Sequence, residues 1–173
     1  MLGRGGVYNH QRLNFNASFE LSRTQSGSIP QQGGGVTRAR ILVADDHKRM
    51  RDEVVRLLNR EFHVLESVAD GHALLQAEAR LKPDVCVVDI SMPVMNGLDA
   101  AAVLKHNGAA SKIVFLTIHD DADFVSAALR TGAEGYVIKT RMTTDLPVAV
   151  REVLAGRTFV SELDSKGTSD RKV

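Results

Sequence analysis

The fold is decided by the stretch Val85-Cys86-Val87-Val88-Asp89-Ile90-Ser91-Met92-Pro93-Val94-Met95-Asn96-Gly97. Its four leading apolar residues predict a short strand that is buried on both faces. Asp89 ends this strand, and the Asn96-Gly97 pair marks the turn into a following helix. A buried strand that ends on a carboxylate is typical of the site edge of a parallel sheet.

Similar apolar runs lie on both sides of this stretch, at residues 41–44, 62–68, 113–116 and 135–138. Segments with helical periodicity separate them; in one, Met50, Val54 and Leu58 repeat at the spacing of one helix face. Strands that alternate with helices through short connections predict an α/β fold. We therefore expect a doubly wound, five-stranded parallel sheet with helices on both faces.

The last predicted helix closes near Gly156. Its inward side chains are expected to be Leu146, Val150, Val153 and Leu154. The segment 142–145, Met-Thr-Thr-Asp, is expected to supply the N-cap, because Thr and Asp side chains accept hydrogen bonds from the first turn.

Composition limits the function classes. The 173 residues are 43% apolar and 25% charged, which suits one globular domain with additional segments. The net charge of +1 argues against a dedicated nucleic-acid binder, and no apolar run approaches the roughly 18 residues of a membrane span. The single cysteine, Cys86, excludes an intrachain disulfide framework and favours the cytoplasm; we expect it to be a small buried hydrophobe.

Three segments are predicted: a disordered, glycine-rich leader at 1–38, a folded domain at 39–157 and a polar tail at 158–173. Seven of the 14 glycines fall in residues 1–35. A basic arm is the alternative, with four arginines in residues 1–39. Because a valine codon can start a bacterial gene, we also expect the native protein to begin at Val36; a genuine flexible arm would look equally unstructured.

Polar residues follow four of the predicted strands: Asp45-Asp46, Asp89, Thr117 and Lys139. The carboxyl ends of parallel strands meet at one edge, so these side chains should share one site. Three close carboxylates require a cation, and oxygen ligands select Mg²⁺. A lysine and a hydroxyl opposite the metal suit a phosphoryl group, and the central carboxylate, Asp89, could attack phosphorus to form an acyl phosphate.

Each residue also has an ordinary interpretation when it is taken singly. Asp45 or Asp46 would be a helix N-cap, Thr117 a β-branched strand residue and Lys139 a solvated loop residue. His47 is expected in the first helical turn and not as a Mg²⁺ ligand. The coincidence of the polar residues at successive strand ends favours the functional interpretation.

Together these segments resemble the receiver domain of bacterial two-component response regulators. The resemblance covers residues 39–157 and is carried by residues 41–47, 88–97, 115–117 and 132–139. It implies the flavodoxin-like strand order 2-1-3-4-5. It also implies that Asp89 is the phosphoacceptor and that Asp45, Asp46 and Asp89 hold Mg²⁺ with the main-chain carbonyl of Ser91.

The resemblance assigns the remaining site residues as well. Lys139 would pair with the bound phosphoryl group, Thr117 would move to hydrogen-bond it, and Tyr136 would swing inward as an aromatic switch. His119 lies where the family places residues that tune dephosphorylation. Thr140 follows Lys139 where many receivers have a cis-proline, so no such isomer is implied.

Residues 117–121 and 156–161 resemble the NarL/FixJ-type subfamily. Those regulators continue into a LuxR-type helix-turn-helix of roughly 60 residues, whereas 12 residues follow Ser161 here. We therefore expect a receiver without its DNA-binding domain, and no specific DNA binding. The expected phosphodonor is a sensor histidine kinase or phosphotransfer protein, and output passes through contacts with an unidentified partner.

Two alternatives stay open and one is disfavoured. The chain could be the front half of a NarL/FixJ-type transcriptional regulator, and a homodimer that forms on phosphorylation is also open. A phosphatase of the haloacid-dehalogenase class is disfavoured, because it needs a second Asp where Ser91 stands. The chain is thus expected to be no enzyme beyond its own phosphorylation and dephosphorylation.

Overall fold

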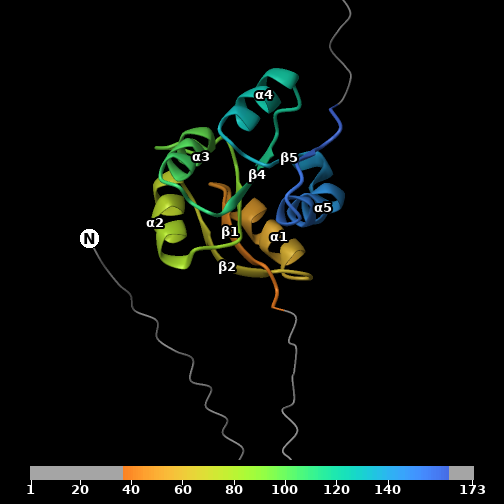
Figure 1. The fold of residues 1–173 in the computed structure, drawn as a ribbon. Helices are drawn as coiled ribbons and strands as arrows, with labels where there is room; N and C mark the ends of the chain where they lie inside the picture. The colour runs from red at the N-terminus through yellow and green to blue at the C-terminus, as the bar shows by residue number, and fades with distance from the viewer. Residues whose placement is uncertain (1–36, 164–173) are drawn as a thin grey trace, which may run out of the picture. The chain divides into compact units, whose positions relative to one another are not determined.

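Strand and helix alternate throughout the described part of this computed structural model, residues 37–163 (Figure 1). The elements are β1 (Arg40–Ala44), α1 (Lys48–Leu58), β2 (His63–Val68), α2 (Gly71–Leu81), β3 (Val85–Val88), α3 (Gly97–His106), β4 (Lys112–Thr117), α4 (Ala122–Arg130), β5 (Gly135–Ile138), the 3-10 turn η1 (Lys139–Arg141), α5 (Met142–Leu154) and β6 (Phe159–Val160). The predicted leader, up to residue 36, and the predicted tail, from residue 164, lie outside the described residues.

All neighbouring strands pair in parallel, in the order β2-β1-β3-β4-β5-β6. This confirms the fold class and the order 2-1-3-4-5, but the prediction of five strands was wrong. Residues 159–160, which we placed in the polar tail, form β6 beside β5. A strand of two residues has no periodicity to read, so only its pairing reveals it.

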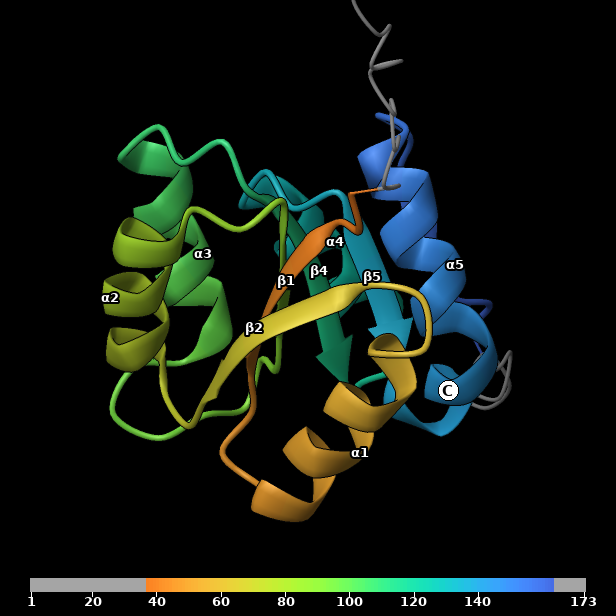
Figure 2. The ribbon, with the colours of Figure 1, turned by 90° about the horizontal axis from the view of Figure 1, so that it is seen from below.

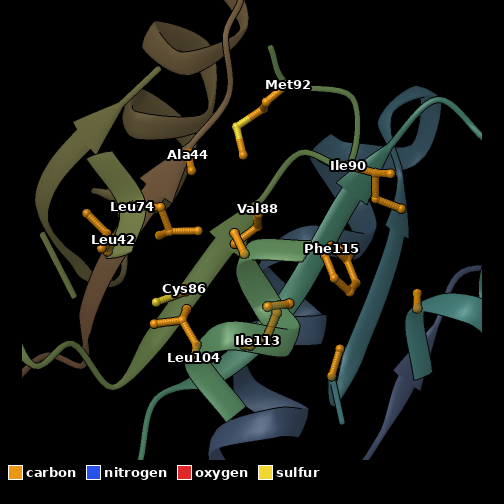
Figure 3. Packing of buried hydrophobic residues seen from close by; sticks show 14 of the residues in the cluster. Leu42, Ala44, Leu74, Cys86, Val88, Ile90, Met92, Leu104, Ile113 and Phe115 are labelled. Atoms are coloured by element: carbon orange, nitrogen blue, oxygen red, sulfur yellow. The ribbon is translucent and has the colours of Figure 1, made fainter. Parts of the chain in front are cut away.

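Helices cover both faces of the sheet (Figure 2). Buried residues of α2, α3 and α4 pack on one face and those of α1 and α5 on the other. Alternate residues of a strand point to opposite faces of the sheet. In β1, Leu42 lies on the face covered by α2, α3 and α4, and Ile41 lies on the face covered by α1 and α5. The first layer is drawn in Figure 3 and includes Cys86, which is fully buried as expected. Within residues 37–163 no helix has the length and apolar character to cross a bilayer.

Two predictions for the last helix were wrong. Leu154 is 40% exposed instead of inward, because it is the last residue of α5 and points about 100° around the helix from the buried Val153. The helix begins at Met142, directly after η1, and its N-cap position is Arg141 with no side-chain cap. The Asp145 side chain, expected to contribute to a cap, instead bonds to Ser161 and Arg141.

The start of α3 is packed directly against the end of β3. A Cβ atom on Gly97 would lie 2.1 Å from the carbonyl oxygen of Asp89, so only glycine fits there. The Asn96 side chain caps this helix by accepting a hydrogen bond from the Asp99 N–H at 2.9 Å. This close approach fixes the backbone of Asp89 where β3 ends.

Candidate functional site

Carboxylates gather where β1 and β3 end. Asp45 follows β1, Asp89 follows β3, and both residues are at most 3% exposed. The Asp89 N–H donates to the Ala44 carbonyl at 2.8 Å, which holds the two strand ends side by side. One ligand atom from each of Asp45, Asp46, His47 and Asp89 lies within 4.8 Å of the others. The predicted acidic cluster is therefore present in the structure.

Lys139 reaches this cluster from the first position of η1. Its Nζ lies 2.8 Å from Asp45 Oδ2 and 2.8 Å from Asp89 Oδ2, and its side chain is 10% exposed. Burial would lower the pKa of Lys139, but the hydrogen bonds and charges of the two carboxylates outweigh it and raise that pKa. The ammonium group is thus held in its charged form between two strands.

Two carboxylate oxygens at the site, Asp45 Oδ2 and Asp46 Oδ1, are buried without an aligned hydrogen bond. Each has a close ionic neighbour, Lys139 Nζ at 2.8 Å and His47 Nδ1 at 2.6 Å respectively. These contacts are short but poorly directed, so lone pairs on both oxygens stay available. Three carboxylates and one ammonium also leave a local charge of about −2. Hard oxygen donors with this charge fit a divalent cation such as Mg²⁺.

Ser91 lies at the rim of the carboxylate cluster. Its N–H donates to Asp89 Oδ1 at 3.2 Å, and its Oγ lies 3.4 Å from Nε2 of His119. The His119 ring stacks on Phe124 of α4, with ring centroids 3.8 Å apart. The loop after β4 therefore contacts the loop after β3 across the site.

The two predicted switch residues are both hydrogen-bonded to His119. The Thr117 hydroxyl accepts from the His119 N–H at 3.2 Å, and the Tyr136 hydroxyl donates to the His119 carbonyl at 2.9 Å. Tyr136 is fully buried, and burial raises its pKa to about 12. We expected this ring to turn inward as Thr117 moves, whereas the structure already has it inside.

His47 and Arg51 fix the loop that carries the acidic pair. His47 is the N-cap residue of α1, one position before the first turn in which we expected it, and its N–H donates to Asp45 Oδ1 at 2.8 Å. Arg51 Nη1 donates to the carbonyls of Asp45 at 2.6 Å and Asp46 at 3.1 Å. Arg51 was not predicted as a site residue, because one basic residue in a charged helix carries no distinguishing signal in the sequence.

The chain matches the family described as the response regulator receiver domain over residues 41–151. It belongs to this family. It is 36% identical over 124 residues to the oxygen regulatory protein NreC of Staphylococcus haemolyticus, covering 70% of this chain and 57% of NreC. It is 34% identical over 125 residues to the transcriptional regulatory protein DegU of Brevibacillus brevis, covering 71% of this chain and 53% of DegU. The chain thus spans little more than half the length of these relatives.

Solved structures support the same assignment. The signal receiver domain of the putative response regulator NarL from Mycobacterium tuberculosis superposes with a TM-score of 0.67 and 32% identity, covering 69% of this chain and 98% of that one. A LuxR-family two-component response regulator from Aurantimonas sp. gives a TM-score of 0.68 and 31% identity, over 70% and 89% of the chains. The expected subfamily is confirmed, and receiver domains are signalling proteins and not classical enzymes.

Proposed function

We propose that this receiver accepts a phosphoryl group on Asp89 from a phosphohistidine of a sensor histidine kinase or phosphotransfer protein in the cytoplasm. The observation that carries the proposal is the placement of Lys139 Nζ, 2.8 Å from both Asp45 and Asp89, as the ammonium group shared by a buried cluster of carboxylates.

The transfer is a displacement at phosphorus. A carboxylate oxygen of Asp89 attacks, the P–N bond of the phosphohistidine breaks, and its electron pair leaves with the imidazole, which takes up a proton. The product is an acyl phosphate on Asp89. Lys139 already contacts the attacking carboxylate, so its ammonium is placed to pair with oxygens of the incoming group.

The residues that would hold Mg²⁺ are Asp45, Asp46 and Asp89, with the main-chain carbonyl of Ser91. Bound Mg²⁺ supplies positive charge that offsets repulsion between the carboxylates and the phosphoryl oxygens. The unmatched oxygens of Asp45 and Asp46 support this assignment.

The Thr117 and Tyr136 hydroxyls would transmit the change, since both bond to the backbone of His119. A phosphoryl group that draws Thr117 toward it breaks the bond to the His119 N–H and frees the loop before α4. The face formed by α4, β5 and α5 should then respond and contact the output partner. NMR with a beryllofluoride phosphoryl mimic checks this; chemical-shift changes confined to the carboxylate cluster would contradict it.

Intact-mass measurement after incubation with acetyl phosphate and Mg²⁺ tests the phosphoacceptor directly. We expect one added phosphoryl group on the wild type, none on Asp89→Ala, and none when EDTA removes the metal. Circular dichroism should show that the variant keeps its fold. Equal labelling of wild type and variant would remove the assignment of Asp89.

A second candidate follows from the named relatives. DegU is described as a transcriptional regulatory protein, and the chain covers 53% of it. This favours a role as the receiver half of a DNA-binding regulator, whereas we propose that the 173-residue chain itself binds no specific DNA site. A sequence-specific footprint at physiological salt would contradict that proposal. Size-exclusion chromatography with and without acetyl phosphate tests whether phosphorylation produces a homodimer.

A further inference from the structure

The connection between β5 and α5 is held by a buried pair outside the carboxylate cluster. Ser161, just after β6, is 2% exposed, and Asp145 of α5 is 8% exposed. The Ser161 hydroxyl donates to Asp145 Oδ2 at 2.7 Å, a short bond to a carboxylate. The proposed phosphoacceptor chemistry uses neither residue.

This pair contacts the backbone before Lys139 and the Arg141 side chain after it. The N–H of Ile138, the residue before Lys139, donates to Ser161 Oγ at 3.3 Å. The Nε of Arg141, the last residue of η1, donates to Asp145 Oδ2 at 3.0 Å. The turn that presents the lysine is therefore fastened at its start by Ser161 and at its end by Asp145.

The Asp145 carboxylate carries enough hydrogen bonds to act as a fixed anchor. Thr144 Oγ1 donates to Asp145 Oδ1 at 2.8 Å, so both carboxylate oxygens have donors. Burial would raise the pKa of Asp145, but the hydrogen bonds from Ser161, Thr144 and Arg141 outweigh it and lower that pKa. The anchor is thus a carboxylate with a hydrogen-bond donor beside each oxygen.

The segment after α5 is also joined to the strand that carries Tyr136. The Ser161 N–H donates to the Tyr136 carbonyl at 2.9 Å, and the Phe159 N–H donates to the Glu134 carbonyl at 3.0 Å. β6 therefore runs along β5 toward Lys139, and Ser161 is the last residue of this ladder.

We propose that Ser161 and Asp145 are positioning residues for Lys139, so that the segment after α5 forms part of the phosphoacceptor site. This inference rests on the proposed function. Ser161 accepts from the backbone before the lysine, Asp145 accepts from the side chain of Arg141 two residues after it, and the hydroxyl-carboxylate bond joins the two. Because coupling between two sites is reciprocal, a phosphoryl group on Asp89 should in turn change the hydrogen exchange of the Ser161 amide.

The test compares Ser161→Ala and Asp145→Asn with Val160→Ala, in the full chain. Val160 belongs to the same segment, but its side chain is 38% exposed and belongs to neither hydrogen-bonded group. The rate of Asp89 phosphorylation by acetyl phosphate is measured at saturating Mg²⁺, and the Kd for Mg²⁺ is measured separately. Asp145→Asn keeps the side-chain volume, so it serves where Ser161→Ala does not fold.

We expect both variants to phosphorylate about tenfold more slowly, because small displacements of a catalytic group are costly, and Val160→Ala to match the wild type. The Kd for Mg²⁺ should change much less than the rate, since the proposed ligands Asp45, Asp46 and Asp89 follow β1 and β3 and are not positioned by Ser161 or Asp145. An unchanged phosphorylation rate would overturn the inference while the proposed function stands. A parallel loss of Mg²⁺ affinity would also overturn it, because that result indicates general loosening. A wild type that takes up no phosphoryl group would instead refute the proposed function, and this inference with it.

Discussion

The two ends of β5 carry opposite versions of one arrangement. Before the strand, Glu134 Oε1 lies 2.9 Å from Lys105 Nζ and 3.4 Å from Lys112 Nζ, so that one carboxylate sits between two lysines. After the strand, Lys139 Nζ sits between the carboxylates of Asp45 and Asp89. In both places burial disfavours the charged form of the central residue, but hydrogen bonds and neighbouring charges of opposite sign outweigh burial. The pKa of Glu134 is therefore lowered and that of Lys139 is raised.

The two ends of β5 differ in whether their carboxylate oxygens accept aligned hydrogen bonds. Glu134 Oε2 accepts from the Ile113 N–H at 2.8 Å, so each of its oxygens has a donor. At the other end Asp45 Oδ2 and Asp46 Oδ1 are the only buried side-chain oxygens without an aligned hydrogen bond in residues 37–163. Shifted pKa values and buried ion pairs thus occur in a structural cluster as well; the unmatched oxygens mark the end that can take a ligand.

The largest effect should appear when the central charged residue at each end of β5, Lys139 or Glu134, is replaced by a neutral residue and the two phosphorylation rates are compared. Lys139→Met should slow phosphorylation of Asp89 about 100-fold, because it removes the ammonium that offsets charge on the transferred group. Glu134→Gln should leave the rate within about twofold of the wild type, since Glu134 lies at the opposite end of the strand. Stopped-flow labelling with acetyl phosphate measures both. Equal slowing in the two variants would erase the functional distinction between the ends.

The stability of the fold should depend on Glu134, although the phosphorylation rate should not. Glu134→Gln should lower the free energy of unfolding by about 2 kcal/mol, because Lys105 and Lys112 lose their shared charged acceptor. Urea denaturation measures this change. Glu152→Gln is the matched control: its ion pair with Arg157 lies at the surface and should contribute much less. A Glu134 variant as stable as that control would show that the cluster has no structural role.

Mg²⁺ should act on one end alone. At ten times its Kd, Mg²⁺ should stabilise the wild type by about 1.4 kcal/mol through binding to the folded state. Thermal unfolding should show the full effect in Glu134→Gln and a much smaller one in Asp46→Asn, which loses one of the unmatched oxygens. Stabilisation of all three proteins to the same degree would place the cation elsewhere.

The smallest effect concerns pH. Because the folded-state pKa of Glu134 lies below its ordinary value of 4.5, the unfolded chain binds the proton first as pH falls. The contribution of Glu134 should be complete well above pH 4.5 and be lost as pH drops through the folded-state pKa. Urea unfolding of wild type and Glu134→Gln from about pH 6 to 3 should show their difference shrinking. A difference that stays constant would show that the lowered pKa has no consequence for folding.

Sequence alone determined the core of the fold, and it predicted which polar residues lie at the carboxyl edge of the sheet. Strands buried on both faces require continuous apolar runs, and helices against a sheet require a 3.6-residue period, so both leave local signals. A parallel sheet then brings all the carboxyl ends to one edge, which predicts that Asp45, Asp89, Thr117 and Lys139 lie near one another; the structure joins Asp45, Asp89 and Lys139 directly.

Only the tertiary structure reveals the polar contacts that fix the backbone around the carboxyl edge of the sheet. Arg51 on the Asp45 carbonyl, the cluster around Glu134 and the pairing of Ser161 with Asp145 each depend on single polar residues brought together by the fold. A lone serine or arginine has the same local signal whether it is solvated or buried, and a two-residue strand has no period. Such contacts follow from packing between elements, so they become visible only when the elements are placed in space.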